Sequence, residues 1–260
     1  VMQTAELDVS PHTRSITTHS GGEVVICING MEALTEDVAT LRAKNIRSIE
    51  YIRTPSGKYA GKAGLVNFIT YKLEYGGNVY LSATEGLAYK SGDYLAFTDF
   101  TRKGLTLSLT ASGDWAHDHS YSEGHEDFTF SDRSTLTRDF TSETSLRKTN
   151  NQAVRLKLTS TGNSHRLNAY VSLTRQAVPS VEAAMKALYT GRYDGTTQRL
   201  TSSDSRGLAP AVYANYTLWL PKDQTLDFTA SASFGHNRYN SHYTETAQSA
   251  MTSDVTEDNN

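Results

Sequence analysis

The stretch Leu105-Thr106-Leu107-Ser108-Leu109-Thr110-Ala111-Ser112 alternates strictly between apolar and hydroxyl-bearing side chains. Successive side chains of a strand point to opposite faces of a sheet, so this period of two puts the aliphatic residues on one face and the polar residues on the other. The same alternation returns at 154–159, 166–173 and 226–234. It predicts a mainly β fold in which most strands have one apolar and one polar face.

The connections between these strands are expected to alternate between short and long. Short turns fall at 102–104, 161–164 and 221–223, whereas long polar segments fall at about 118–146 and 179–206. In outer-membrane barrels short turns face the periplasm and long loops face outside. The asymmetry predicts a transmembrane β-barrel instead of a soluble sandwich, and the odd number of strands given below would make it an incomplete one. About seven antiparallel strands are expected, at roughly 77–89, 93–101, 104–117, 147–160, 165–177, 207–219 and 225–243.

The composition excludes several other classes of protein. Only 37% of the 260 residues are hydrophobic, and no apolar run approaches the ~18 residues of a membrane-spanning helix. The net charge is -3 and the 25 basic residues are scattered, which gives no support to a nucleic-acid partner. The chain opens on Val1-Met2-Gln3 without a signal peptide. For an exported protein, we therefore expect either that the front was removed or that this sequence is a fragment.

The first part of the chain, to about residue 72, has a mixed α and β pattern. An apolar strand is expected at Val24 to Ile28, followed by the turn pair Asn29-Gly30. A short helix is expected from Thr35, where Glu36 and Asp37 suit a first turn. Further strands are expected at 46–52 and 65–70.

No catalytic constellation has local motif support, so the chain is not expected to be an enzyme or to hold a cofactor. Cys27 lies inside an apolar run and is expected to be a small buried hydrophobe. The glycine-rich loop 56–64 lacks the Lys-Ser/Thr pair and the following helix of a phosphate-binding loop.

Four blocks in this first part resemble the plug domain of TonB-dependent outer-membrane receptors. They are Val25-Ile26-Cys27-Ile28-Asn29-Gly30, Asn45-Ile46-Arg47-Ser48-Ile49-Glu50-Tyr51-Ile52, Pro55-Ser56-Gly57-Lys58-Tyr59 and Val66-Asn67-Phe68-Ile69-Thr70. Their order and spacing match those of the family. Thr54 and Ala60 stand where that family often has Gly, which suits a divergent branch similar to the Bacteroidota-type outer-membrane β-barrel proteins.

The resemblance implies a division of the chain and a set of structural residues. Residues 1–72 would be the C-terminal part of a plug, and 73–260 the N-terminal portion of a barrel that has about 22 strands when whole. The chain would be a fragment that ends in an external loop at 253–260. The glycines of the plug motif are expected to let its loop fold tightly against the barrel wall. The plug-motif residues are Asn29, Gly30, Pro55, Gly57, Tyr59, Gly61, Gly64 and Asn67.

The resemblance also implies a function. The chain would belong to an outer-membrane receptor of a Gram-negative bacterium that takes up an unidentified nutrient with energy from the TonB complex. Its partners would be outer-membrane lipid, TonB and a small-molecule, glycan or peptide ligand. A non-transporting barrel for surface binding or adhesion is the alternative, and a soluble β-rich binding domain is a third hypothesis.

Three further features are expected: ion pairs between the two parts of the chain, a short helix, and a candidate ligand or metal site. Arg47, Glu50 and Arg53 are expected to pair with lumen charges such as Arg155, Lys157 or Asp227, against the alternative of solvated side chains. The segment 181–189 has a helical pattern and predicts a short helix in an external loop. A second loop is a candidate ligand or first-row metal contact, although a solvated loop explains the same residues. Its candidate residues are His117, His119, His125 and Glu126.

Overall fold

A computed structural model describes residues 7–10, 15–71, 74–88, 90–222, 224–246 and 250–259. Within these ranges most residues lie in strands, which form a two-stranded hairpin, a four-stranded sheet and a ten-stranded antiparallel sheet. The predicted mainly β fold class is confirmed. In the same ranges, no helix has the length and apolarity needed to cross a bilayer.

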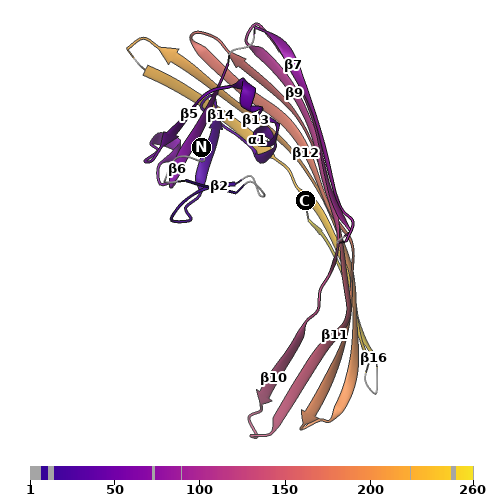
Figure 1. Ribbon diagram of the computed structural model, residues 1–260. Helices are drawn as coiled ribbons and strands as arrows, with labels where there is room; N and C mark the ends of the chain where they lie inside the picture. The colour runs from indigo at the N-terminus through magenta and orange to yellow at the C-terminus, as the bar shows by residue number, and fades with distance from the viewer. Residues whose placement is uncertain are drawn as a thin grey trace.

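Residues 7–10 and 15–70 form a small unit that lies in the hollow of the curved ten-stranded sheet (Figure 1). Its four-stranded sheet has the order β4-β3-β6-β5, with β3 parallel to β6 and the other pairs antiparallel. The three predicted strands and the short helix are confirmed. The elements are β1 (Leu7–Ser10), β2 (Ser15–Thr18), β3 (Val24–Ile28), β4 (Met31–Glu32), α1 (Thr35–Thr40), η1 (Ala43–Asn45), β5 (Ile46–Ile52), η2 (Gly57–Tyr59) and β6 (Gly64–Thr70).

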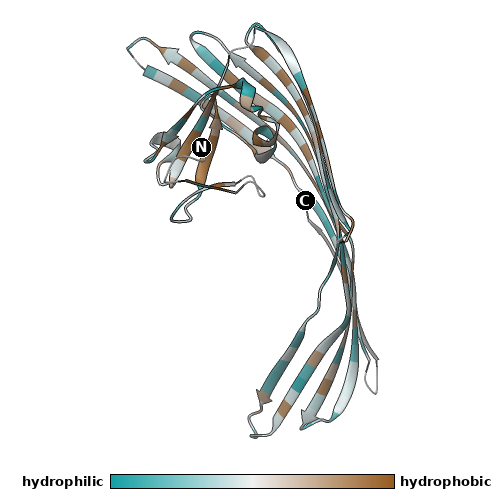
Figure 2. Ribbon diagram, in the orientation of Figure 1, coloured by the Kyte–Doolittle hydropathy of each residue, from teal (hydrophilic) through white to brown (hydrophobic). Residues whose placement is uncertain are grey.

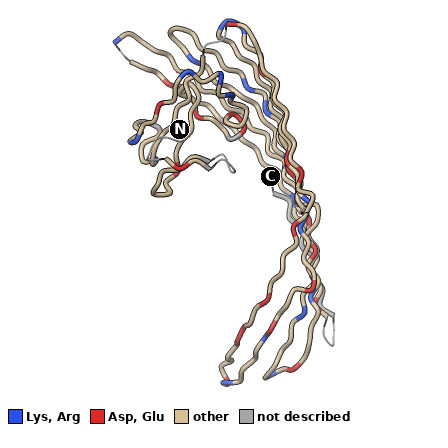
Figure 3. The backbone as a smooth tube through the Cα atoms, in the orientation of Figure 1, with Lys and Arg blue, Asp and Glu red and all other residues tan. Residues whose placement is uncertain are grey.

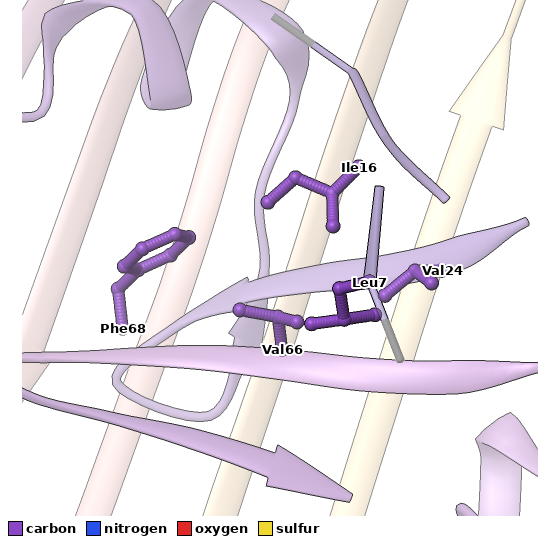
Figure 4. Packing of buried hydrophobic residues seen from close by; sticks show 5 residues of the cluster. All are labelled: Leu7, Ile16, Val24, Val66 and Phe68. Atoms are coloured by element: carbon purple, nitrogen blue, oxygen red, sulfur yellow. The ribbon is translucent and has the colours of Figure 1, made fainter. Parts of the chain in front are cut away.

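The small unit has a hydrophobic core on each side of its sheet. β3 and β6 lie side by side at the centre, so their alternate side chains are covered from both faces. Val66 is fully buried in the first core, which Figure 4 shows close by, and Cys27 is 1% exposed in the second. Cys27 is therefore the buried residue that the sequence predicts. The first core contains Leu7, Ile16, Val24, Val66 and Phe68; the second contains Val25, Cys27 and Leu65.

The long sheet is an antiparallel meander in which each pass pairs with the next one along the chain. β9 and β10 both pair with β11, and β14 and β15 both pair with β13, so the ten described strands make eight passes. The strands are β7 (Tyr75–Gly86), β8 (Ser91–Arg102), β9 (Leu105–His119), β10 (Glu123–Thr129), β11 (Thr135–Thr161), β12 (His165–Gly191), β13 (Gly195–Leu220), β14 (Gln224–Ser233), β15 (His236–Thr246) and β16 (Ala250–Asn259).

Several predictions about the distal half of this sheet are wrong. The expected long loops at 118–146 and 179–206 are largely strand, because the chain there extends β11, β12 and β13 and adds β10. The expected helix at 181–189 lies within β12, between β11 and β13. Hydrogen bonding to two neighbouring strands satisfies this backbone completely and outweighs a local preference for helix.

The C-terminal part of the sheet also differs from the prediction. The single strand expected at 225–243 is two strands, β14 and β15, with an interruption at Phe234 and Gly235. The tail expected to be a loop at 253–260 lies in β16 as far as Asn259 and pairs with β15. Ser, Thr and Asp are typical of loops, but here hydrogen bonding to the neighbouring strand β15 outweighs that local preference.

The register of the long sheet assigns its side chains to two faces. Arg155 of β11 is buried toward the small unit, whereas the adjacent Val154 and Leu156 are 49% and 43% exposed. Residues paired across a ladder share a face, so the register carries this division from β7 to β14. We call the face that carries Arg155 the inner face and the opposite one the outer face.

The outer face carries an apolar band across all the passes from β7 to β14. Figure 2 shows the hydrophobic residues recurring along these strands. One line of paired residues shows how continuous the band is. It runs through Val79, Thr98, Leu109, Leu156, Val171, Val212 and Ala232.

Candidate functional site

The candidate site is the contact between the small unit and the inner face, which we call the docking contact. Asp37 of α1 lies at its centre, between two cations of β11. Arg155 donates from Nη2 to Asp37 Oδ1 at 3.1 Å, and Lys157 donates from Nζ to Asp37 Oδ2 at 3.0 Å. The side chain of Asp37 is 11% exposed, and those of Arg155 and Lys157 are 9% and 16% exposed. The docking contact is therefore an ion-pair network that is largely removed from water.

Local sequence explains why Asp37 points this way. It occupies the third position of α1 and accepts a hydrogen bond from the backbone N–H of Leu34 at 3.1 Å. A carboxylate has about four lone-pair sites, so Asp37 can serve this backbone donor and both cations together. The adjacent Glu36 lies 3.8 Å from Arg155 Nη1 and is more exposed. Two carboxylates thus face two cations at the start of the helix.

The turn Asn29-Gly30 makes a second contact with the inner face. Arg166 of β12 donates from Nη1 to the Asn29 carbonyl oxygen at 2.9 Å. Asn29 and Gly30 have φ angles of 51° and 76°, so the turn presents this carbonyl outward. A Cβ at residue 30 would lie 2.7 Å from Arg166 Nη1. Glycine therefore suits the backbone angle here, and a larger residue would make the Arg166 side chain shift.

One further contact completes the docking contact. Arg42, just after α1, donates from Nη2 to the backbone carbonyl of Val79 on β7 at 2.7 Å. Tyr59 of the small unit is held by a hydrogen bond with Cys27, and burial followed by this hydrogen bond raises the pKa of Tyr59. The small unit therefore meets the sheet at β7, β11 and β12.

The inner face beneath the small unit is polar and buried. Asn168, Asn215 and Thr217 are 7%, 7% and 1% exposed. Asn215 donates to Thr229 Oγ1 at 2.9 Å, and the Thr217 hydroxyl donates to Asp227. These hydrogen bonds join neighbouring strands of the long sheet to each other. The docking contact itself is made by the charged side chains described above.

The structure brings part of the predicted plug motif together. Asn67 is buried, accepts the Gly30 N–H at 2.8 Å and donates to Glu50 at 3.0 Å. Asn29 pairs with Thr70 through its side chain. The turn and β6 are thereby tied to each other, which fixes the carbonyl that Arg166 binds.

The glycine-rich loop has a different role from the predicted one. Gly57 and Gly61 have φ angles of 63° and 86°, and a Cβ on either would meet nothing within 4 Å. Gly64 packs against the ring of Tyr51 within the small unit. These glycines serve the turns and the internal packing of the small unit, and not a close approach to the wall. The remaining motif residue, Pro55, is buried just after β5.

Glu50 does not make the predicted ion pair with the cations of the inner face, and those cations pair with another residue. Arg155 and Lys157 pair with Asp37 of α1, whereas Glu50 is hydrogen-bonded to Asn67 inside the small unit. Asp227 is hydrogen-bonded to Thr217 on the neighbouring strand. The signals for the real contact were present in the sequence, as two acidic residues at a helix start and cations on the polar face of a strand. Their pairing depends on where α1 lies.

The structure does not bring the predicted histidine cluster together. His117 and His119 of β9 pair with Lys148 and Leu146 of β11, whereas His125 of β10 pairs with Asp139. The seven to nine residue steps along β11 between these partners separate the two groups by about 20 Å or more. Glu126 forms an ion pair with Arg138. Among the described residues, no set of three or more His, Cys, Asp or Glu side chains is arranged to hold a metal ion.

His125 instead bridges two carboxylates at the end of the sheet. Its Nδ1 lies 2.6 Å from Asp139 Oδ1 and its Nε2 lies 3.1 Å from Asp127 Oδ2. The hydrogen bond with Asp139, followed by that with Asp127, raises the pKa of His125. The side chain is exposed, so this arrangement is a cross-strand link and not a buried centre.

Comparisons with known proteins give remote structural likenesses. No protein family and no curated protein matches the chain. The chain is similar to the ferric yersiniabactin uptake receptor FyuA of Yersinia pestis, with 12% identity, a TM-score of 0.25 and coverage of 97% of this chain and 56% of that one. It is also similar to the outer-membrane transporter YddB of Escherichia coli, with 10% identity, a TM-score of 0.24 and coverage of 94% and 50%. The chain spans about half the length of these two transporters.

Proposed function

We propose that the chain is part of an outer-membrane receptor that carries a nutrient through a plugged β-barrel, driven by the TonB complex. The small unit would be part of the plug, and the long sheet part of the barrel wall. We propose no enzymatic role and no nucleic-acid partner. The apolar band on the outer face is the observation that carries the proposal.

The band has the composition and height that a bilayer requires. Leu109, Leu156 and Val212 are all more than 40% exposed, although they lie in the middle of the sheet. Soluble proteins rarely expose continuous apolar surface of more than a few hundred Å², because it remains in unfavourable contact with water. From Leu105 to Trp115 the band spans ten steps of β9, which at the tilt of barrel strands gives a height of about 25 Å, as in known outer-membrane barrels.

The inner face supports the transport part of the proposal. Its polar side chains suit a water-filled lumen, and the small unit occupies that side of the sheet. The docking contact uses charge and hydrogen bonds instead of a shared hydrophobic core. Water can replace such contacts when the small unit moves, whereas a hydrophobic interface would resist separation. TonB would supply the work for this movement.

Surface binding without transport is the second candidate function, and the length of the strands favours it. β11 and β12 each have 27 residues, whereas about 9–11 residues are enough to cross a bilayer. More than half of each strand would therefore project from the membrane. A projecting sheet provides binding surface whether or not the barrel transports anything.

The first experiment tests the membrane location. The full-length protein is expressed in a Gram-negative host, and inner and outer membranes are separated by density. We expect the protein in the outer membrane, with a folded form that migrates differently in electrophoresis before and after boiling. Recovery of a folded protein in the aqueous fraction without detergent would contradict the proposal.

The second experiment separates transport from surface binding. In the double variant Asp37→Cys/Lys157→Cys, a bifunctional thiol reagent that is cleaved by reduction would bridge the gap left by the long lysine side chain and hold the small unit on the sheet. If the protein transports, the growth advantage of the wild type over a deletion strain on a limiting nutrient disappears in the cross-linked variant and returns on reduction. The two single variants are the controls. Unchanged growth in the cross-linked variant would favour surface binding.

A further inference from the structure

We propose that the free edge of β10 binds an extended peptide that carries Lys or Arg on one face and apolar side chains on the other. The peptide would add to the sheet as a further strand, through backbone hydrogen bonds. This inference goes beyond the proposed function, because the edge is unpaired whether or not the sheet lies in a membrane. It assigns a partner of defined chemistry to the distal half of the long sheet.

β10 lies at a margin of the distal half of the sheet (Figure 1). It pairs with β11 on one side, and no other strand of the described chain pairs with it. The hairpin of β7 and β8 is too short to cover it, because the turn of that hairpin at Lys90 is level with His117 of β9. A strand added beyond β7, or at the other end of the strand order, would not reach this edge either. The free edge therefore follows from the described topology.

The backbone of β10 presents a regular row of donors and acceptors at this edge. At one end Ser142 donates to the Ser122 carbonyl at 2.8 Å, and at the other end Phe130 donates to the Ser134 carbonyl at 2.9 Å. Such pairs recur at every second residue of an antiparallel ladder, so the even-numbered residues of β10 bond to β11. The N–H and C=O groups of the odd-numbered residues from Glu123 to Thr129 therefore point outward. The ladder has no bulge, and β10 has neither the Lys nor the Pro that often protects an edge.

One face of the free edge is acidic. Glu123 and Asp127 lie on it, next to Asp139 of β11. His125 lies on the same face and is bonded to both aspartates. On these two strands, a single imidazole therefore faces three carboxylates.

The nearby cations do not neutralise this acidic face. Arg138 points to the opposite face, where it pairs with Glu126. Lys186 shares the acidic face but lies on β12, two strands from the edge. Along the hairpin from 123 to 139, five carboxylates outnumber two arginines (Figure 3). A partner strand with Lys or Arg on this face would bring unlike charges into cross-strand pairs, which stabilise a sheet.

The opposite face of the edge is aromatic. The ring of Phe140 lies over Gly124, where any Cβ would collide with it, so the ring extends from β11 across β10. Phe128 of β10 is 41% exposed on the same face. The guanidinium of Arg138 lies 5.6 Å and 5.9 Å from the centres of the Phe128 and Phe140 rings. An added strand would cover these rings best with apolar side chains at every second position.

A second copy of β10 fits this edge less well than a cationic peptide. In an antiparallel pair that uses all seven residues, Glu126 would lie directly opposite Glu126 of the second copy. A shift of two residues in either direction would place Asp127 opposite Glu123 or opposite Asp127 of the second copy. Like charges in directly opposed positions destabilise a sheet. The charge pattern therefore favours a partner with cations.

The first part of the test uses synthetic peptides and the full-length protein purified in detergent. The probe is the peptide Lys-Val-Lys-Val-Lys-Val-Lys with blocked ends, and fluorescence anisotropy measures its binding. In the proposed pairing the lysines lie opposite the odd-numbered residues of β10, so the lysine N–H groups face the edge. N-methylation of three lysine backbone nitrogens removes these donors. N-methylation of the three valine backbone nitrogens is the matched control, because it alters only the far edge of the peptide.

The second part of the test changes the charge of the protein. Glu123→Lys/Asp127→Lys reverses the charge of the acidic face. The matched control, Glu182→Lys/Asp204→Lys, makes the same change on β12 and β13, each of which is paired on both sides. A second peptide with Glu in place of Lys is titrated against the wild type and both variants. Electrophoresis before and after boiling checks that each variant folds.

We expect the wild type and the control variant to bind the Lys peptide about tenfold more tightly than the Glu peptide, and the charge-reversed variant to prefer the Glu peptide. N-methylation at lysine should weaken binding about a hundredfold, because about three backbone hydrogen bonds are lost, whereas N-methylation at valine should change it less than about threefold.

Three results would overturn the inference. They are no binding by the wild type, equal effects of the two methylations, and the same peptide preference in the wild type and the charge-reversed variant. Self-association of the wild type that Glu123→Lys/Asp127→Lys abolishes would overturn it in favour of a second copy. Each of these results leaves the membrane location untouched, because membrane fractionation tests the proposed function separately.

Discussion

The small unit and the long sheet bury their apolar residues in opposite ways. In the small unit, Val66 and Cys27 are almost completely buried between a sheet and its covering segments. In the long sheet, Val171 and Phe228 are 51% and 60% exposed, although both lie on regular strands. The small unit therefore has a core that the hydrophobic effect stabilises in aqueous surroundings. The long sheet has an exposed apolar face that would be stable only against a second apolar surface, such as the hydrocarbon of a bilayer.

This difference shows that similar strands need different surroundings. Both regions use β-branched and aromatic residues, and both satisfy their backbone by pairing with neighbouring strands. Only the small unit surrounds its strands on both faces. The docking contact joins the two regions through polar groups, so the apolar residues of the small unit and those of the outer face do not share a core.

The largest expected effect tests the core of the small unit. Phe68→Ala removes a ring that is 7% exposed, and should destabilise β6 by about 3–4 kcal/mol because it leaves a cavity. Phe228→Ala is the matched control, since that ring lies on the outer face of the long sheet. Hydrogen exchange of the β6 amides in the full-length protein measures the effect. Faster exchange of β6 in both variants would break the comparison.

The second prediction tests the apolar band with two adjacent exposed residues of β14. Ala232→Arg places a charge in the band and should destabilise the folded protein in lipid vesicles by about 2–4 kcal/mol. Ser231→Arg places the same charge on the inner face, where water is available, and should change stability little. Denaturant titration in vesicles measures both variants. Equal destabilisation would mean that the two faces of β14 do not differ in environment.

The third prediction separates docking from folding. Asp37→Asn keeps the shape of the side chain but removes the charge between Arg155 and Lys157, which should weaken the docking contact by about 2 kcal/mol. Glu36→Gln should have a much smaller effect, because Glu36 is farther from Arg155 and more exposed. Hydrogen exchange should increase at 34–41 while β6 stays protected. Loss of protection in β6 as well would show that docking and folding are one event.

The smallest expected effect concerns pH at the distal end of the long sheet. The pKa of His125 is raised by its bonds with Asp139 and Asp127, so protonated His125 stabilises the pairing of β10 with β11. This stabilisation is complete below the ordinary histidine pKa of about 6.5 and is lost as the pH rises through the higher folded value. Titration of the His125 ring signal by NMR measures the pKa. Asp139→Asn should lower it, and an unchanged midpoint in that variant would contradict the assignment.

Patterns that depend on neighbouring residues were predictable. The strict alternation around Leu107 gave the faces of the long strands, and the run from Val24 to Ile28 gave the central strand of the small unit. The Asn29-Gly30 turn was likewise recognisable because both residues tolerate positive φ. Each of these features is set by the preferences of a few consecutive residues.

Polar segments were predicted less well. Residues 181–189 favour a helix when considered alone, but β11 and β13 supply hydrogen-bonding partners on both sides and make them a strand. The Ser- and Thr-rich segments expected to be loops extend the sheet for the same reason. A strand that is wet on both faces has no apolar period to reveal it.

The sequence by itself determined which side chains of each strand lie together, because alternation between the faces is a property of the extended backbone. It also determined that the inner face would carry Arg155 and Lys157. Only the tertiary structure decided that Asp37 would be their partner and that Arg166 would bind the Asn29 carbonyl. These groups come from segments far apart in the chain, and their distances depend on the register and curvature of the whole sheet.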